Sequence, residues 1–218
     1  SPDIIYKSDV GGVELNIGSE QSLRDAYASI MARTLEAQPT ARIDGVSVQA
    51  MRKRRHAREL MVGVTADASF GPVITFGAGG IAVEIMQDRA LSLPPVNHYL
   101  VDRMIDKTRI GKILGPFKNM PGVDLDTLKS VLLHVSELVC ELPEVREMDI
   151  NPLVADESGV IALDARIIVQ APKRGKPYGH MAIMPYPMHM VHCSMLKDGT
   201  PVNIRPVRPE DADMTQAF

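Results

Sequence analysis

The stretch EMDINPLVADESGVIALDARIIV, residues 147–169, constrains the fold more than any other part of the chain. It sets carboxylates and an amide within an apolar run that is rich in Val, Ile and Leu. The sequence DESG at residues 156–159 favours a tight reversal, because Asp, Ser and Gly suit turn positions. Antiparallel pairing about that turn sets Asn151 opposite Asp164, so the stretch is predicted to form a β-hairpin.

The same register decides which side chains share a face, because side chains alternate along a strand. Asp149 falls opposite Arg166, on the face that also carries Asn151 and Asp164. The other face is apolar and is expected to carry Ile150, Val154, Ile161, Leu163 and Ile167. An amide oxygen beside a carboxylate can ligate Mg²⁺, which needs few protein oxygens when phosphate and water complete its octahedron. The same pair also suits a solvated sheet face.

The rest of the chain predicts helices mixed with short strands. Apolar residues at helical spacing predict helices over residues 19–38, 97–114 and 124–142. Ser19 is a suitable N-cap for the first helix, and Pro39 ends it. Alternation and β-branching predict strands over 45–51 and 59–67, and a strand pair over 69–86 that a glycine cluster interrupts. This order predicts an α+β (mixed α/β) fold.

Composition narrows the class of protein. The 218 residues, 45% hydrophobic and 23% charged, with a net charge of −3, are typical of a soluble globular protein. The run MRKRRHAREL, residues 51–60, is a more usual feature of a solvated helix end or loop than of a nucleic-acid site. The two cysteines lack metal-site spacing, and no apolar run approaches the ~20 residues of a membrane span. We therefore expect a cytoplasmic protein without nucleic-acid or membrane partners.

The character of the chain changes after residue 170. Residues 171–193 are rich in Pro, Met and His without a period, which predicts a linker or an arm lying over a surface. Its histidines have no metal-site signature around them. The Asp-Gly pair in MLKDGTPVNIRPV predicts a hairpin, and RPEDADMTQAF is typical of a helix start. Residues 194–218 are thus expected to begin a further domain, incomplete here, within a longer protein.

Two glycine-containing segments are candidate phosphate sites. In KSDVGGV, residues 7–13, the backbone near the glycines could approach a phosphate that Lys7 neutralises. FGAGG, residues 76–80, offers the same backbone chemistry. Both are also typical of turns, and neither has the spacing of a Walker loop or a dinucleotide fingerprint. Glu59 opens an apolar strand, where it could bind a ribose hydroxyl or face water.

In order and spacing, several of these segments resemble the ATP-grasp domain of the NDP-forming acyl-CoA synthetases, relatives of the succinyl-CoA synthetase β subunit. The segments are SPDI–KSDVGGV, VSVQAM, ELMVGV–D–FGPVITFGAGGIAVE, LPP, EMDINPL and LDARI. The resemblance covers residues 1–170 and implies an ATP-grasp fold that is truncated at its N-terminal edge. The tail DGTPVNIRPVRPEDADMTQAF resembles the opening of a GNAT acetyltransferase domain. That fusion is similar to the bacterial Pat-type protein lysine acetyltransferases.

The resemblance implies roles for residues of the nucleotide site. Lys7 would contact ATP phosphate, the backbone near Val48 and Gln49 would meet adenine, and Glu59 would lie by the nucleotide. The remaining residues fall at the phosphoryl-transfer end of the site: Gly79 and Gly80 would face the acyl-phosphate and phosphohistidine side, and Asn151 and Asp164 would bind Mg²⁺. The implied cofactors are ATP and Mg²⁺, with CoA or acetyl-CoA in the parent protein. The implied partners are the CoA-binding and GNAT domains of the parent chain and its protein lysine substrates.

One residue departs from the family pattern. Active members commonly read His-Lys-Ser/Thr-Asp where this chain has Tyr6-Lys7-Ser8-Asp9. A phenol with a pKa of ~10 is a poor nucleophile at neutral pH, so Tyr6 cannot relay a phosphoryl group as that histidine does. We therefore expect no catalytic residue in this chain and a degenerate domain that regulates an acetyltransferase.

Two other readings stay open. One is an active NDP-forming acyl-CoA synthetase. The other is an interaction module that binds a partner through residues 51–58 and the linker.

Overall fold

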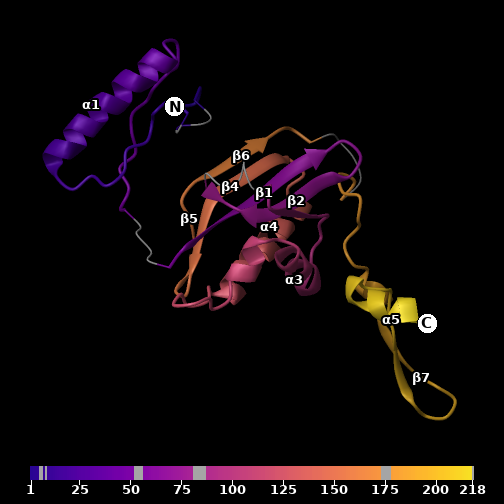
Figure 1. Cartoon of the computed structure of the whole chain (residues 1–218). Helices are drawn as coiled ribbons and strands as arrows, with labels where there is room; N and C mark the ends of the chain where they lie inside the picture. The colour runs from indigo at the N-terminus through magenta and orange to yellow at the C-terminus, as the bar shows by residue number, and fades with distance from the viewer. Residues whose placement is uncertain (5–6, 8, 52–55, 81–86, 173–177, 218) are drawn as a thin grey trace. The chain divides into compact units, whose positions relative to one another are not determined.

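The computed structural model describes residues 1–4, 7, 9–51, 56–80, 87–172 and 178–217 (Figure 1). The chain divides into two units, Ser1–Arg54 and Arg55–Phe218. Among the described residues, the first contains one helix between segments without regular secondary structure, and the second contains a sheet with helices on one face. The α+β class predicted from the sequence is therefore confirmed.

The helix of the first unit, α1, spans Glu20–Ala37. The hydroxyl of Ser19 accepts a hydrogen bond from the backbone N–H of Ser22 at 3.1 Å, and the Ser22 hydroxyl accepts one from the N–H of Ser19 at 3.0 Å. This reciprocal capping box satisfies two donors that a helix start leaves unpaired. The helix ends two residues before Pro39, as predicted.

The strand expected over residues 45–51 is not formed. Residues 41–51 have no regular structure, and Val48 and Met51 are 68% and 50% exposed. Alternating β-branched residues favour an extended backbone, but a strand also needs a hydrogen-bonded neighbour. Within the described part of the chain, no strand pairs with this segment.

The second unit is built on a six-stranded antiparallel sheet. Its strands are β1 (Arg58–Asp67), β2 (Gly71–Ala78), β3 (Arg89–Ser92), β4 (Val145–Asp156), β5 (Gly159–Ala162) and β6 (Ala165–Val169). Their order is β3-β2-β1-β4-β5, and β6 also pairs with β4. The prediction for residues 59–67 is confirmed, as is the first strand of the pair expected over 69–86. The second strand of that pair falls on residues 81–86, outside the described residues.

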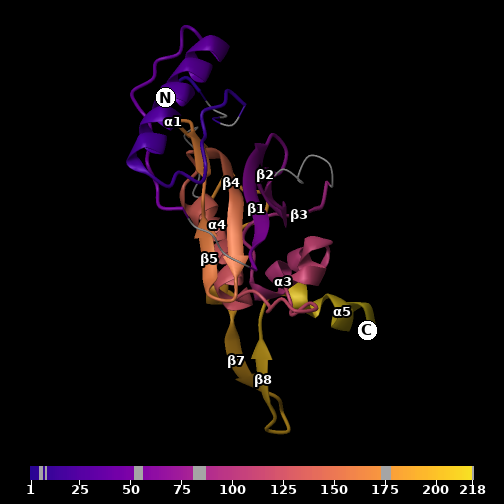
Figure 2. The same ribbon diagram turned by 60° about the vertical axis from the view of Figure 1, so that its left-hand side comes forward.

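Helices cover one face of this sheet (Figure 2). They are α3 (His98–Asp106), the short 3-10 helix η2 (Ile110–Ile113) and α4 (Leu125–Glu141). Leu128 and Leu132 of α4 are fully buried with Leu60, Ile74 and Phe76 of the sheet. Each such side chain contributes about 1.5–3 kcal/mol of hydrophobic stabilisation. The helix-covered face forms the core. Polar groups of the sheet, including Glu59, Asp149 and Arg166, lie on the opposite face, called here the outer face.

The predicted hairpin forms in the predicted register, but its apolar face is not the one expected. Met148 and Ile150 face the core, and so do Leu153 and Ala155. The alternation reverses between these two pairs, because Asn151 and Pro152 together lie opposite Met61 alone. Such a β-bulge shifts every later side chain to the other face.

Three of the five predicted apolar positions differ in the structure, and the bulge accounts for two of them. Val154 of β4 lies on the outer face, and Ile161, which pairs with it, lies there too. Leu163 lies between β5 and β6 and belongs to neither strand. Ile150 and Ile167 share one face, as predicted, and with residues of α4 they line an open apolar groove of about 290 Å³.

The C-terminal segment contacts the helical layer, as expected of an arm. Nε2 of His180 lies 2.9 Å from the carbonyl oxygen of Val139, and the Tyr178 hydroxyl donates to Glu141 at 3.1 Å. The predicted hairpin is confirmed as β7 (His192–Met195) and β8 (Pro201–Ile204), after the 3-10 helix η3 (Met188–Met190). The predicted helix start is confirmed as η4 (Pro209–Asp211) and α5 (Ala212–Ala217).

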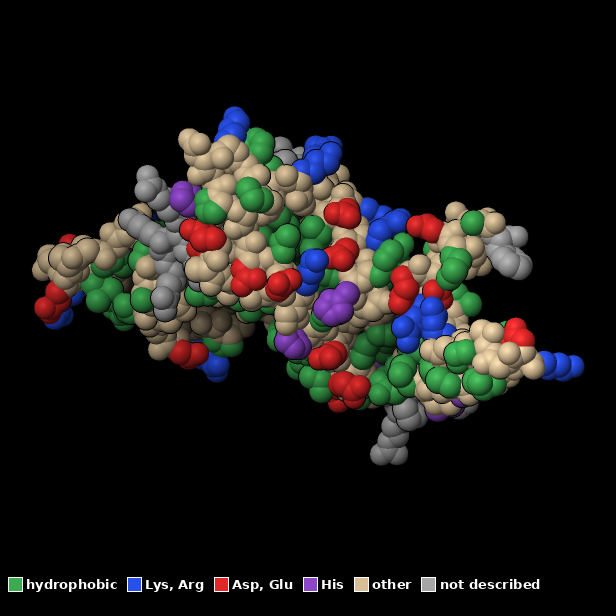
Figure 3. Space-filling view, turned by 90° about the horizontal axis from the view of Figure 1, so that it is seen from below, with side chains coloured by type: hydrophobic (Ala, Val, Ile, Leu, Met, Phe, Trp, Pro, Cys, Tyr) green, Lys and Arg blue, Asp and Glu red, His purple; other side chains and the backbone are tan. Residues whose placement is uncertain are grey.

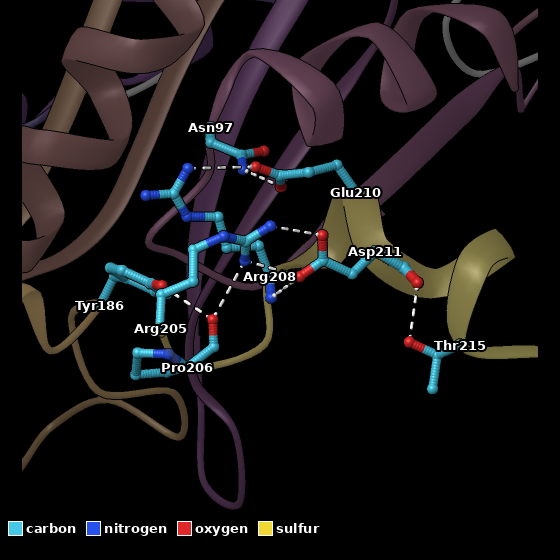
Figure 4. Close-up of polar contacts among 8 residues, drawn as sticks. All are labelled: Asn97, Tyr186, Arg205, Pro206, Arg208, Glu210, Asp211 and Thr215. Carbon is cyan, nitrogen blue, oxygen red and sulfur yellow. Dashed lines mark hydrogen bonds and ion pairs between the residues drawn. The ribbon is translucent and has the colours of Figure 1, made fainter. Parts of the chain in front are cut away.

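A polar cluster joins this segment to α3 (Figure 4). The guanidinium of Arg205 donates twice to the Asp211 carboxylate, at 2.7 Å for each bond, and the N–H of Arg208 adds a third bond at 2.8 Å. These donors lower the pKa of Asp211 to about 2. Next to it, Glu210 accepts a hydrogen bond from Nδ2 of Asn97, the N-cap of α3, at 2.9 Å.

Charge is mixed over the surface. On the face in Figure 3, acidic and basic side chains are interspersed. Residues 52–55 of the basic run lie outside the described residues, so the interaction reading is not tested there. Among the helices described, none is both long and apolar enough to cross a membrane.

Candidate functional site

The outer face of the sheet gathers the polar residues of the hairpin. The backbone N–H of Asn151 donates to the carbonyl oxygen of Asp164 at 3.2 Å, which confirms the predicted cross-strand pair. Two positions along, Asp149 lies opposite Arg166 in the β4–β6 ladder. The turn at residues 156–159 and the strict pairing that follows it bring these four residues together.

Two carboxylates and a guanidinium lie near one another on the outer face. Burial raises the pKa of Asp149, the Arg166 guanidinium opposes that rise, and the nearby Asp164 carboxylate adds to it. Arg166 also lies 3.7 Å from the carboxylate of Glu147. A divalent cation near the two aspartates would relieve their mutual repulsion.

A second set of residues meets Asn151 from two other strands. Oδ1 of Asn151 accepts a hydrogen bond from the backbone N–H of Gly80, just beyond β2, at 2.9 Å. Gly80 in turn lies against the carboxylate of Glu59 on β1. The N–H of Gly79 donates to the carbonyl oxygen of Glu59 at 2.8 Å and extends the β1–β2 ladder by one bond. The structure thus brings Glu59, Gly79, Gly80 and Asn151 together.

Tight packing explains the glycine-rich sequence of residues 76–80. A Cβ at Gly77 would overlap the carbonyl of Asp88, and one at Gly79 would overlap the backbone of Leu60. A Cβ at Gly80 would overlap the Glu59 carboxylate, and φ there is +67°, which favours glycine. Packing within the protein therefore accounts for these glycines without any bound ligand.

Lys7, Val48 and Gln49 belong to the first unit. The carbonyl oxygen of Lys7 accepts a hydrogen bond from the N–H of Gly12 at 2.8 Å, so this segment forms a closed turn with Lys7 exposed. Val48 and Gln49 are exposed in a segment without regular structure. Tyr6 lies outside the described residues, so the structure does not test its expected role.

The donor set fits Mg²⁺ better than a softer metal. Among the described residues, no group of three or more His, Cys, Asp or Glu side chains could hold a metal alone. Asn151 and Asp164 offer hard oxygen donors, and Mg²⁺ commonly takes only one or two carboxylates together with phosphate and water. The sequence predicted that Asp149 and Arg166 share this face with the pair, and the β4–β6 ladder confirms that they lie opposite one another.

Comparison with known proteins identifies the family of the chain. The family model of the ATP-grasp domain matches residues 1–169. The β subunit of acetate–CoA ligase [ADP-forming] I from Pyrococcus furiosus is 38% identical over 169 residues, which are 78% of this chain and 72% of the relative. Acetate–CoA ligase [ADP-forming] I from Archaeoglobus fulgidus is 39% identical over 78% of this chain, which spans only 24% of that relative.

Solved structures give the same result. A crystal structure from Pyrococcus horikoshii has a TM-score of 0.71 at 38% identity, covering 79% of this chain and 72% of that one. The dinucleotide-forming acetyl-CoA synthetase 1 of Ca. Korarchaeum cryptofilum, in complex with CoA and Ca-AMPCP, has a TM-score of 0.68 at 33% identity, covering 78% and 73%. The chain therefore belongs to the ATP-grasp family, as a domain of the kind found in the β subunits of ADP-forming acyl-CoA synthetases.

Proposed function

We propose that the outer face of the sheet binds a nucleoside triphosphate with Mg²⁺, and that Asn151 and Asp164 are the cation ligands. The observation that carries this proposal is their pairing across the hairpin, beside a second aspartate, Asp149. Glu59, Gly79 and Gly80 would adjoin the phosphates. Lys7, Val48 and Gln49 are assigned to phosphate and adenine on the sequence resemblance alone.

Within such a site, the protein's own groups would bind and orient the nucleotide. Mg²⁺, when bound, would neutralise charge on the phosphates. Asn151 and Asp164 would fix its place on the sheet, and the glycine backbone at residues 79–80 would allow a phosphate to approach closely. The relatives support this proposal, because one solved neighbour contains CoA with Mg-AMPPCP and has a phosphohistidine segment pointing towards its nucleotide-binding site.

For the whole protein, we propose that this domain regulates an acetyltransferase and does not act as an acyl-CoA ligase. The resemblance places Tyr6 where active family members commonly carry a relay histidine, and a phenol does not replace an imidazole in phosphoryl relay. The sequence of residues 198–218 supports an acetyltransferase domain, with protein lysines as its substrates. Acetyl-CoA would be the acyl donor in that parent protein, at a site outside this chain.

The second candidate is an active acyl-CoA synthetase, which the names of the relatives favour. Incubation of the complete protein with ATP, CoA and acetate separates the two. Sustained release of ADP would overturn the regulatory proposal. The regulatory proposal instead predicts binding of Mg²⁺-ATP without turnover, and ADP release only after Tyr6→His restores an imidazole at that position.

A further inference from the structure

One hydrogen bond links the glycine-rich segment to the proposed cation site. Gly80 follows β2 and Asn151 lies on β4, so the bond reaches across β1, which separates the two strands. It forms where Asn151 and Pro152 bulge against Met61. The bulge therefore places the amide of Asn151 within reach of a backbone group from a strand that is not its neighbour.

The chemistry of the two groups fixes how the Asn151 amide is oriented. A backbone N–H can only donate, so it must meet the oxygen of the amide and not its NH₂ group. An amide oxygen has two acceptor positions, and Gly80 occupies one of them. The second position is the one that a hard cation would take.

We propose that the backbone N–H of Gly80 is a positioning group that holds Oδ1 of Asn151 ready to ligate a divalent cation. This inference rests on the proposed function of Asn151. Groups that orient a metal ligand through its other polar contact commonly change metal affinity by about 10–100-fold. The residue at position 80 would then affect cation binding without touching the cation.

The surroundings of Gly80 explain why glycine occupies this position. Its φ of +67° is strained for other residues, and a Cβ would overlap the Glu59 carboxylate. A side chain here must displace either Glu59 or the backbone at Gly80, and the second movement would break the bond to Asn151. Gly199 is a matched control, because its φ is +86° and a Cβ there would meet nothing within 4 Å.

The test compares Gly80→Ala with Gly199→Ala in the complete protein. Calorimetry measures the affinity for a non-hydrolysable ATP analogue with Mg²⁺ and with EDTA, and a thermal melt confirms folding. We expect Gly80→Ala to weaken binding with Mg²⁺ about tenfold more than it weakens binding in EDTA. Gly199→Ala should match the wild type in both conditions. Equal Mg²⁺-dependent binding by the two variants, together with a Gly80 amide signal that Mg²⁺ does not move in the wild type, would overturn the inference.

A second measurement uses the unaltered protein, in case Gly80→Ala does not fold. The amide signal of Gly80 in a ¹⁵N–¹H NMR spectrum should shift when Mg²⁺ is added to the analogue-bound protein, because a cation on Oδ1 polarises the shared oxygen. Asn151→Ala should abolish that shift. If the Gly80 signal does not move while Mg²⁺-dependent binding is intact, the positioning role is wrong but the proposed function still holds. If the wild type shows no Mg²⁺-dependent binding, the proposed function fails as well.

Discussion

Gly79 lies so close to Leu60 that a single added methyl group would overlap the Leu60 backbone. The contact continues the β1–β2 ladder beyond the last residue of β2, since the N–H of Gly79 bonds to Glu59 at 2.8 Å. It brings Gly80 to Asn151 and so helps to assemble the outer face. The glycine cluster therefore supports the candidate site through packing.

Gly79→Ala should destabilise the second unit by about 2 kcal/mol or more, because neither backbone can yield easily. Chemical denaturation followed by circular dichroism measures the change. Gly115→Ala is the matched control, since a Cβ there meets nothing within 4 Å. Equal stability of the two variants would show that the backbones of Gly79 and Leu60 leave room for a methyl group.

Arg58 is a buried cation held by carbonyl groups. It is 4% exposed, and its guanidinium donates to the carbonyl oxygens of His56 at 2.6 Å, Pro121 at 2.7 Å and Ile113 at 3.0 Å. Arg58→Met keeps the aliphatic stem but removes every donor. We expect a loss of about 3 kcal/mol in the free energy of unfolding, because the buried carbonyls lose their partners.

The control for this variant is Arg146→Met, at an exposed position on β4. It should change the stability by less than about 0.5 kcal/mol, as is usual for surface substitutions. If Arg58→Met is as mild as Arg146→Met, water replaces the guanidinium and the hydrogen-bond account is wrong.

The Arg205–Asp211 pair predicts acid sensitivity of the C-terminal segment. Its hydrogen bonds lower the pKa of Asp211 from 3.8 to about 2. A carboxyl group whose pKa is lower in the folded state than in the unfolded state stabilises the fold at any pH above its unfolded-state pKa. That stabilisation is lost as the pH falls through the folded-state pKa. Hydrogen exchange of residues 205–217 should therefore lose protection between pH 3.8 and about 2.

Asp211→Asn supplies the comparison, because an amide does not titrate in this range. In that variant, residues 205–217 should already be weakly protected from hydrogen exchange at pH 5, and acidification should change this protection little. Retention of full protection by the wild type below pH 2 would mean that the ion pair does not hold the segment.

The register of the hairpin could be predicted from the sequence, because antiparallel strands pair residue by residue outward from their turn. A turn at residues 156–159 determines every opposite pair as far as Asp149 and Arg166. Helix α4 was equally predictable, because its apolar residues recur at helical spacing and Asp124 caps its start. Both features depend on residues that are close in sequence.

Other features depend on contacts between distant residues. The bulge at Asn151 and Pro152 is defined only by β1, so sequence alternation wrongly placed Val154 with Ile150. The bond from Gly80 to Asn151 joins residues 71 positions apart and depends on that bulge. The segment 45–51 has a strand-like pattern but no strand partner among the described residues, and local pattern alone cannot supply one.

The most direct test of the cation site is a calorimetric titration with ATP, in Mg²⁺ and in EDTA. The wild type should bind more tightly with Mg²⁺, and Asn151→Ala and Asp164→Ala should each lose about tenfold in affinity only when Mg²⁺ is present. Asp126→Ala, an exposed aspartate at the start of α4, should bind as the wild type does. Unchanged Mg²⁺-dependent binding by both site variants would contradict the assignment of Asn151 and Asp164 as cation ligands.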